Sequence, residues 1–278
     1  MTQKTWLITG VSSGFGLEMT KLLLAKGDTV VGTVRKPEAV AELAAQYPQT
    51  FDCRVLDVRD GVAVRATVET AFAKHGRIDV VVSNAGYGLF GAAEELSDTE
   101  VDDIVGTNLM GSINLIRAAL PHLRAQKGGR IIQMSTYGGM VAYPGNSMYH
   151  ATKWGIEGFA ESVAQEVAPF GIGVTIVEPG GARTDFRYRS AHVAKLMPEY
   201  DGNPAHAFLR MLDKANGLAP GNPTLMAERI IESVDVTLAP LRMVLGSQAL
   251  SATIDALEKR LANFRTQTEL AASTDYAE

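Results

Sequence analysis

Short runs rich in β-branched residues alternate with helical patterns along most of this chain, and this alternation restricts the possible fold more than any other feature. The runs are Thr5–Thr9, Thr29–Val34, Phe51–Leu56, Ile78–Ser83, Arg130–Ser135, Gly173–Val177 and Leu241–Leu245. Such alternation is typical of strand–helix–strand units that build a parallel sheet. Most of the runs mix few polar residues with apolar ones, as expected for strands that helices cover on both faces. The sequence therefore predicts an α/β fold with a doubly wound, seven-stranded, mostly parallel sheet.

One domain accounts for most of the chain. Its 278 residues, 46% of them hydrophobic, suit a single core, and no linker rich in Pro, Gly or Ser interrupts the sequence before Asp185. We expect a domain over residues 1–265, with helices at Thr224–Leu238 and Ser247–Phe264, and a loosely held tail over 266–278. Residues 185–222 lose periodicity and gather large apolar side chains, which is typical of a lid over a substrate site. These side chains could equally pack on the body or on a neighbouring subunit.

Composition also argues against several classes of protein. The net charge of −5 includes no basic stripe, which disfavours nucleic acid as a partner. Cys53 is the only cysteine, which rules out an internal disulfide framework and favours a reducing, cytoplasmic setting. The five histidines are not closely paired, so no metal site is expected. The sequence has neither a signal-peptide pattern nor an apolar run of about eighteen residues, so we expect no membrane insertion.

A glycine-rich turn follows the first predicted strand and leads into a helical pattern. The turn comprises Gly10, Val11, Ser12, Ser13, Gly14, Phe15 and Gly16. Glycines let a ligand approach the backbone, and the N-terminus of the next helix presents unpaired N–H groups to a phosphate. The spacing matches neither the common G-x-G-x-x-G fingerprint nor a Walker loop. The turn predicts a dinucleotide-phosphate site in a Rossmann-like domain, although such glycines could also form only a tight turn.

Tyr149 and Lys153 are four residues apart in a helical segment, which places a phenol and an ammonium on one face of that helix. A free phenol titrates near pH ~10, and a neighbouring cation favours its charged form. We therefore expect Lys153 to lower the pKa of Tyr149, so that the phenol can give and take a proton during interconversion of a carbonyl and an alcohol. The same spacing could also be an ordinary contact on an exposed helix.

Four motifs in order along the chain resemble the short-chain dehydrogenase/reductase family over about residues 4–182. They are Thr9-Gly10-x-x-x-Gly14-x-Gly16, Asn84-Ala85-Gly86, Tyr149-x-x-x-Lys153 and Pro179-Gly180. The resemblance implies that Tyr149 is the general acid and base, and that Lys153 also holds the nicotinamide ribose. It places Asn108 in a water relay, although Asn108 could instead bridge backbone groups. It further implies a homodimer or homotetramer, often through the helix of Tyr149, where Trp154, Ile156, Phe159 and Val163 could form the contact or face the sheet.

The position of the substrate-orienting hydroxyl departs from the family pattern. The family has a serine thirteen residues before the tyrosine, and here that position is Thr136, with Ser135 one residue earlier. Successive strand residues point to opposite faces, so only one of the two hydroxyls is expected to reach the site. We predict Thr136, with Ser135 as its substitute if the strand end is bulged.

The second predicted strand bears on the choice of cofactor. Arg35 and Lys36 follow this strand where an acidic residue would select NAD, and a basic side chain suits the 2′-phosphate of NADP. NADP(H) is therefore favoured over NAD(H), unless these two residues only solvate the strand end. By the same resemblance, Asp57 and Val58 contact the adenine, and Asn84, Ala85 and Gly86 lie beside the nicotinamide ribose. The segment that grips the carboxamide contains Pro179, Gly180 and Thr184.

Together these features predict an NADP(H)-dependent oxidoreductase that interconverts a carbonyl and a secondary alcohol. The substrate is expected to be a small molecule, bulky and apolar, whose identity and direction of conversion the sequence does not specify. A non-catalytic protein that senses NADP(H) is the alternative, although a sensor has no chemical need for Tyr149 beside Lys153. An epimerase of nucleotide sugars shares the Tyr-x-x-x-Lys motif but has wider glycine spacing.

Overall fold

The computed structural model describes residues 3–184, 190–212 and 219–276, and its centre is a seven-stranded parallel sheet. The strand order is β3-β2-β1-β4-β6-β7-β9, and every neighbouring pair is parallel. The strands are β1 (Thr5–Thr9), β2 (Thr29–Val34), β3 (Phe51–Val55), β4 (Val80–Ser83), β6 (Gly129–Met134), β7 (Ile172–Pro179) and β9 (Arg242–Leu245). The predicted fold class is confirmed. The strand order diverges on either side of β1 and β4, which makes this pair the switch point where open α/β sheets bind ligands.

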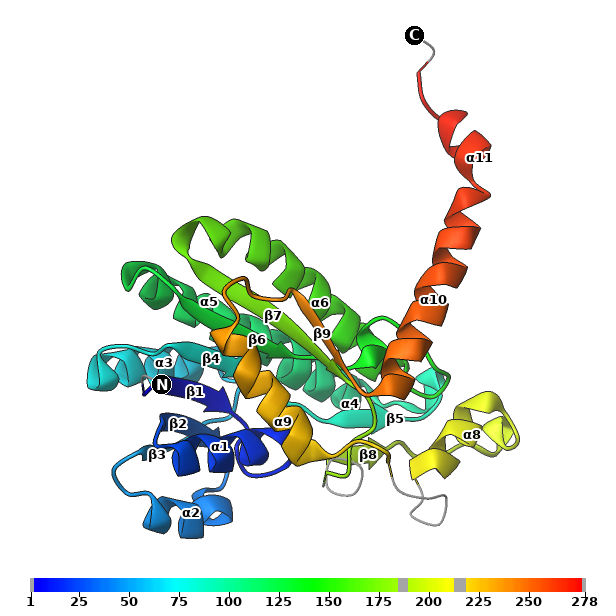
Figure 1. Cartoon of the computed structure of the whole chain (residues 1–278). Coiled ribbons are helices and arrows are strands. Elements are labelled where there is room, and N and C mark those ends of the chain that lie inside the picture. Colours follow the sequence, from blue (N-terminus) through cyan, green and yellow to red (C-terminus); the bar gives the residue numbers. More distant parts are fainter. Residues whose placement is uncertain (1–2, 185–189, 213–218, 277–278) are drawn as a thin grey trace.

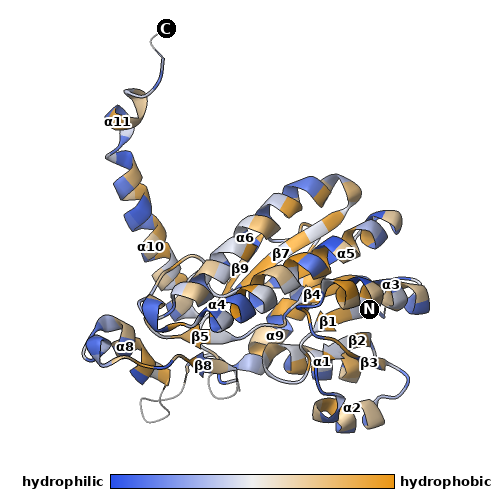
Figure 2. Cartoon of the chain, turned by 180° about the vertical axis from the view of Figure 1, so that it is seen from behind, coloured by the Kyte–Doolittle hydropathy of each residue, from blue (hydrophilic) through white to orange (hydrophobic). Residues whose placement is uncertain are grey.

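Helices cover both faces of the sheet (Figure 1). The helices α3 (Gly61–His75), α5 (Gly111–Ala125) and α6 (Ser147–Val167) pack on one face, and α1 (Gly14–Lys26) and α9 (Pro223–Glu232) on the other. In β1, Leu7 belongs to the first hydrophobic cluster, whereas Trp6 and Ile8 belong to the second. The central strands are correspondingly hydrophobic, as β1 and β7 show most clearly (Figure 2). Burial on both faces explains their lack of apolar–polar alternation.

Shorter elements connect these layers. They include α2 (Ala41–Gln46), α4 (Asp98–Ile104) and a π-helical segment, η3 (Val105–Met110), which joins α4 to α5. Short 3₁₀ turns occur at η1 (Pro37–Val40), η2 (Ala93–Glu95), η4 (Tyr137–Gly139), η5 (Ala168–Phe170), η6 (Pro198–Tyr200), η7 (Arg210–Leu212) and η9 (Ser233–Asp235).

The segment predicted to form a lid contains regular structure that the sequence did not indicate. The strand β8 (Ala191–Val193) pairs in parallel with β5 (Gly88–Phe90), and α8 (Pro204–Leu209) follows. This pairing ties part of the segment to the body of the molecule. Strands of three residues are too short to produce a periodic pattern, so the sequence suggested irregular structure instead. Residues 185–189 and 213–218 of the predicted lid lie outside the described residues.

The C-terminal elements differ in detail from expectation. The helix α9 ends at Glu232, earlier than predicted, and α10 (Ser247–Arg265) matches its prediction closely. The predicted tail contains a short helix, α11 (Thr268–Ala272), and its described residues are exposed. The helices α10 and α11 extend away from the body (Figure 1). No helix within the described ranges is both long and apolar enough to cross a membrane.

Candidate active site

A cavity of about 550 Å³ opens at the carboxyl edge of the sheet, beside the ends of β1 and β4. Most of the residues predicted to bind cofactor or substrate line this cavity. They are Gly10, Ser12, Ser13, Gly14, Phe15, Arg35, Asp57, Val58, Asn84, Ala85, Gly86, Ser135, Thr136, Tyr149, Lys153, Pro179, Gly180 and Thr184. The topology thus brings together motifs that are up to 174 residues apart in the chain, from Gly10 to Thr184.

The glycine turn has a conformation that requires glycine. Gly10 has a φ of 72°, and a Cβ at Gly16 would lie 2.3 Å from the Gly10 carbonyl oxygen. Gly16 does not line the cavity but lets α1 start close to the turn. The Asn84 amide donates hydrogen bonds to the carbonyls of Thr9 and Gly10, which links the ends of β1 and β4. No side chain of the described residues caps the first turn of α1, so its N–H groups suit a phosphate.

Two arginines lie at the end of the cavity beyond β2 and β3. Arg35 is exposed and lines the cavity, whereas Lys36 does not line it. Arg59, which sequence reasoning missed, donates from Nη2 to Asp57 at 2.8 Å and from Nη1 to Asp103 at 2.5 Å. The hydrogen bond from Arg59 lowers the pKa of Asp57, with a smaller contribution from Arg35. The spacing Asp57-x-Arg59 was the available signal for this pair.

Tyr149 and Lys153 lie together on α6, one turn apart, in the wall of the cavity. The Lys153 ammonium donates to the Met134 carbonyl at 3.0 Å and lies 5.9 Å from the centroid of the Tyr149 ring. Burial raises the pKa of Tyr149 above its ordinary value, and a hydrogen bond with the Thr136 hydroxyl lowers it. The expectation that Lys153 lowers the pKa of Tyr149 is therefore wrong: burial raises this pKa, and the opposing effect comes from Thr136. Burial also lowers the pKa of Lys153, to about 8.

Ser135 and Thr136 point in different directions. The Ser135 hydroxyl donates to the Glu157 carboxylate at 2.5 Å and is buried. The Thr136 hydroxyl hydrogen-bonds Tyr149 and also donates to the Pro179 carbonyl at 3.3 Å. Of the two hydroxyls, Thr136 is therefore the one beside the phenol.

Asn108 lies in the π-helical segment η3 and is buried, but it does not line the cavity. Its side chain accepts a hydrogen bond from the backbone N–H of Tyr87 at 3.0 Å and donates to the Tyr87 carbonyl at 2.8 Å. These contacts match the alternative expected for Asn108, in which the amide bridges backbone groups. Its part in a water relay stays a prediction.

Aromatic side chains surround the Tyr149 end of the cavity. Phe90 lies 6.1 Å from Tyr149 and 5.9 Å from Phe208, measured between ring centroids. Tyr143 stacks on Phe208 at 6.2 Å, and Tyr137 lies 5.8 Å from Tyr143. Phe208 comes from the predicted lid, whereas the other three were not singled out in the sequence. We call Phe90, Tyr137, Tyr143 and Phe208 the aromatic wall.

The remaining apolar residues of the predicted lid contribute unequally to the lining of the cavity. Leu212 lines the cavity, but Met197 and Tyr200 do not. Phe186 and Tyr188, with the neighbouring Arg187 and Arg189, lie outside the described residues.

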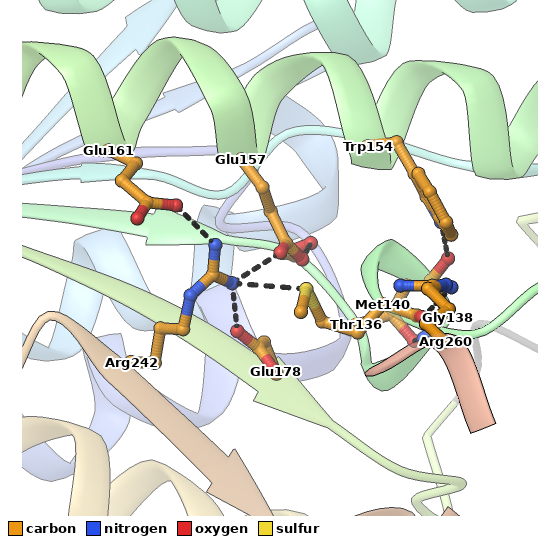
Figure 3. A network of polar contacts seen from close by, with 10 residues as sticks. Thr136, Gly138, Met140, Trp154, Glu157, Glu161, Glu178, Arg242 and Arg260 are labelled. Atoms are coloured by element: carbon orange, nitrogen blue, oxygen red, sulfur yellow. Dashed lines mark hydrogen bonds and ion pairs between the residues drawn. The ribbon is translucent and has the colours of Figure 1, made fainter. Parts of the chain in front are cut away.

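Behind the site, a network of charged residues joins α6 to the last two strands of the sheet (Figure 3). Arg242 of β9 donates hydrogen bonds to Glu157, Glu178 and Glu161 at 2.5, 2.6 and 2.7 Å. Glu157 and Glu178 are almost fully buried. Sequence reasoning missed this network because its members are distributed over α6, β7 and β9.

A doubly wound sheet with a glycine turn and a Tyr–Lys pair at its switch point is typical of α/β proteins that bind dinucleotides. A family model described as short chain dehydrogenase matches residues 4–193, so the chain belongs to the short-chain dehydrogenase family. This is an oxidoreductase family that uses nicotinamide cofactors and acts on small molecules.

Known relatives extend over most of the chain. "Oxidoreductase BOA17" of Botryotinia fuckeliana is 40% identical over 251 residues, covering 89% of this chain and 90% of the relative. A 3-ketodihydrosphingosine reductase of Bacteroides thetaiotaomicron is 36% identical over 77% of this chain and 78% of the relative. The crystal structure of a short-chain dehydrogenase from Streptomyces avermitilis has a TM-score of 0.92 at 36% identity, covering 99% of this chain and all of that one.

Proposed function

We propose that this protein is an NADP(H)-dependent oxidoreductase that interconverts a carbonyl and a secondary alcohol, with Tyr149 as the general acid and base. The observation that carries this proposal is the meeting of the Tyr149 phenol, the Thr136 hydroxyl and the Lys153 ammonium in one cavity beside the glycine turn. A protein that only senses NADP(H) would need the glycine turn but not these three side chains. The three side chains supply what proton transfer to a carbonyl oxygen requires.

Each of these residues has a distinct part in the proposed mechanism. Bound NADPH would supply the hydride to the carbonyl carbon. Thr136 donates a hydrogen bond to the substrate oxygen, and Tyr149 protonates that oxygen. Burial, which raises the pKa of Tyr149, keeps the phenol protonated and ready to act as an acid. Lys153 stabilises the phenolate that forms, because its ammonium is buried close to the ring.

The residues around the cavity fit NADP and an apolar substrate. The uncapped start of α1 and the glycine turn suit the pyrophosphate, and the exposed Arg35 suits the 2′-phosphate. The aromatic wall next to Tyr149 suits a bulky apolar or aromatic carbonyl compound. Asn108, Asp57, Val58, Asn84, Ala85, Gly86, Pro179, Gly180 and Thr184 keep the roles that the family resemblance implies.

Loss of NADPH absorbance with a panel of aromatic, steroidal, keto-ester and quinone carbonyls tests the reaction, with every hit repeated with NADH. Tyr149→Phe should bind NADPH nearly as well as the wild type but lose most turnover, because the phenol is the proton donor. Arg35→Ala should weaken NADPH binding at least ~10-fold and NADH binding little, since only NADPH carries the 2′-phosphate.

Three results would contradict parts of this proposal. Full turnover by Tyr149→Phe would mean that another group protonates the substrate. Equal losses for NADPH and NADH in Arg35→Ala would remove the argument for NADP. Tight NADPH binding by a wild-type chain that reduces none of the carbonyls would favour the sensor alternative.

A homo-oligomer is also part of this proposal, although most of the residues suggested for the contact on α6 do not support it. Ile156 and Val163 are buried inside the chain, and Phe159 packs against the same core. Trp154 is 40% exposed, with the guanidinium of Arg260 4.4 Å from the centroid of its ring. An apolar stripe on α10 supports a contact between copies instead. The stripe consists of Leu250, Ile254, Leu257, Leu261 and Phe264, which are 41–66% exposed. The cytoplasmic setting stays a prediction.

A second copy of this chain is the partner that the stripe suits best. Its residues repeat at spacings of four and three, the a/d pattern with which two helices pair. Glu258 and Arg265 border the stripe on the side away from Arg260. In an antiparallel pair of α10 helices, this edge of the stripe lies against the same edge of the second copy. Glu258 of one copy can then meet Arg265 of the other. In a parallel pair Arg260 would instead approach Arg265 of the second copy.

A further inference from the structure

Glu157 lies one turn after Lys153 on α6 and belongs to the charged network around Arg242 in Figure 3. It is 2% exposed and does not line the cavity, so it cannot touch a substrate bound there. One carboxylate oxygen accepts the hydrogen bond of Ser135, and the other accepts that of Arg242. Both oxygens are therefore held in place, one by the residue that follows β6 and the other by β9.

Arg242 alone does not neutralise the carboxylates around it. It binds Glu157, Glu178 and Glu161, of which only Glu161 is substantially exposed. Burial and the charge of Glu157 raise the pKa of Glu178. Burial disfavours the charged form of Arg242, but the hydrogen bonds that Arg242 donates to the three carboxylates raise its pKa above the ordinary value. A buried cluster whose carboxylates carry more negative charge than its arginine can balance stabilises the charged form of a nearby cation.

Lys153 is the cation that this arrangement favours. Its neighbours one turn away on α6 are Tyr149, which lines the cavity, and Glu157, and β6 contributes only the neutral Met134 carbonyl. Asn108 of η3 and the backbone at Gly86 are also neutral: a Cβ at Gly86 would lie 3.1 Å from Asn108 Oδ1 and 3.8 Å from Lys153 Nζ. Glu161, Glu178 and Arg242 belong to the charged network that includes Glu157. Glu157 is the anionic group among the described residues whose charge acts on Lys153.

We infer that Glu157 is a positioning residue, which acts on the reaction through Lys153 and is itself held by Ser135 and Arg242. Burial lowers the pKa of Lys153 to about 8, and the charge of Glu157 opposes this effect. Without Glu157 the lysine would lose its proton closer to neutral pH. The link to catalysis rests on the function proposed above, whereas the effect on the lysine itself does not.

The inference is tested by titrating Lys153 directly. Protein labelled with ¹³C-lysine is followed by NMR over a range of pH, and Lys153→Arg identifies the resonance. In Glu157→Gln, which keeps the shape of the side chain but removes its charge, the pKa of Lys153 should fall by at least about one unit, as is typical for loss of a close opposite charge. Glu161→Gln is the matched control, because Glu161 also binds Arg242 but lies one turn farther from Lys153.

An unchanged pKa of Lys153 in Glu157→Gln would overturn the inference, and so would an equal fall in Glu161→Gln. If Glu157→Gln does not fold, Glu157→Asp replaces it: the shorter side chain draws the carboxylate away and should lower the pKa of Lys153 by a smaller amount. No change in that variant would equally overturn the inference.

The consequence for the reaction is measured separately. The pH above which kcat/KM declines should fall in Glu157→Gln together with the pKa of Lys153, and Glu157→Asp should recover part of the shift. A merely structural role would lower activity equally at every pH. A wild-type chain without turnover would refute the proposed function but leave the titration result standing.

Discussion

At the scale of single residues, the choice between two adjacent hydroxyls decides how a substrate oxygen is held. Thr136→Ala should lower kcat/KM by roughly 10²-fold, because it removes a donor aimed at the substrate oxygen. Thr136→Ser should keep the activity, since it retains the hydroxyl. Ser135→Ala should lower kcat/KM far less than Thr136→Ala does, and it should lower the free energy of unfolding by about 1–2 kcal/mol, because its bond to Glu157 is buried.

Steady-state kinetics and urea unfolding of the three variants check these expectations. The reverse ranking, with Ser135→Ala inactive and Thr136→Ala active, would move the site by one residue.

The residues of the candidate site differ in how far the sequence could predict them. Tyr149, Lys153 and the glycine turn are visible because short-range spacing carries their chemistry. Arg59, Tyr143 and Glu157 were missed, although they are close to predicted positions. Arg59 also contacts Asp57 two residues away, a local spacing that could have revealed it. The contacts of Tyr143 and Glu157 come from other elements, and no spacing within one helix or strand records them.

At the scale of elements, His150 joins α6 to the loop that follows β6. Its Nδ1 lies 2.6 Å from the Gly138 carbonyl, and its Nε2 accepts the backbone N–H of Tyr143 at 3.2 Å. One nitrogen donates and the other accepts, so the neutral ring satisfies both contacts. Burial lowers the pKa of His150, while the bond to Gly138 opposes this effect.

The pH dependence of stability should reveal this histidine. Its pKa is lower in the folded chain than the value of about 6.5 in the unfolded chain, so below pH ~6.5 the unfolded state binds more protons. The free energy of unfolding should therefore be unaffected by His150 above that pH and fall as the pH drops through it. Between about pH 7.5 and 5.5, wild type should lose more stability than His150→Gln, which cannot titrate. Equal losses in urea unfolding would show that His150 titrates alike in both states.

The elements were predicted with unequal success for a physical reason. All seven strands of the main sheet were found, because long apolar runs stand out in the sequence. The small sheet of β5 and β8 was not, because its three-residue strands gain their stability from pairing across about a hundred residues of chain. The π-helical segment at Asn108 likewise has no local pattern that separates it from α4 and α5.

At the scale of the whole molecule, α10 is a long helix that the described part of the chain leaves largely uncovered. If its stripe joins two copies, Leu257→Glu combined with Leu261→Glu should halve the molar mass in solution, because two carboxylates would face the partner's stripe. Lys259→Glu is the control, since it adds negative charge to the same helix on a face away from the stripe. Light scattering coupled to size-exclusion chromatography measures the mass of each protein. An unchanged mass in the double variant, or a halved mass in the control, would contradict a stripe-mediated contact.

The sequence by itself determined the class of fold, the positions of the main strands along the chain and the motif residues, because hydrophobic periodicity and short-range spacing are local properties of the chain. Only the tertiary structure decided that Thr136 rather than Ser135 meets Tyr149, that Arg242 gathers three carboxylates behind Lys153, and that Phe208 completes an aromatic wall. These arrangements depend on contacts between residues tens of positions apart. Burial then sets the pKa values of Tyr149 and Lys153, and burial is a property of the packed chain rather than of any motif.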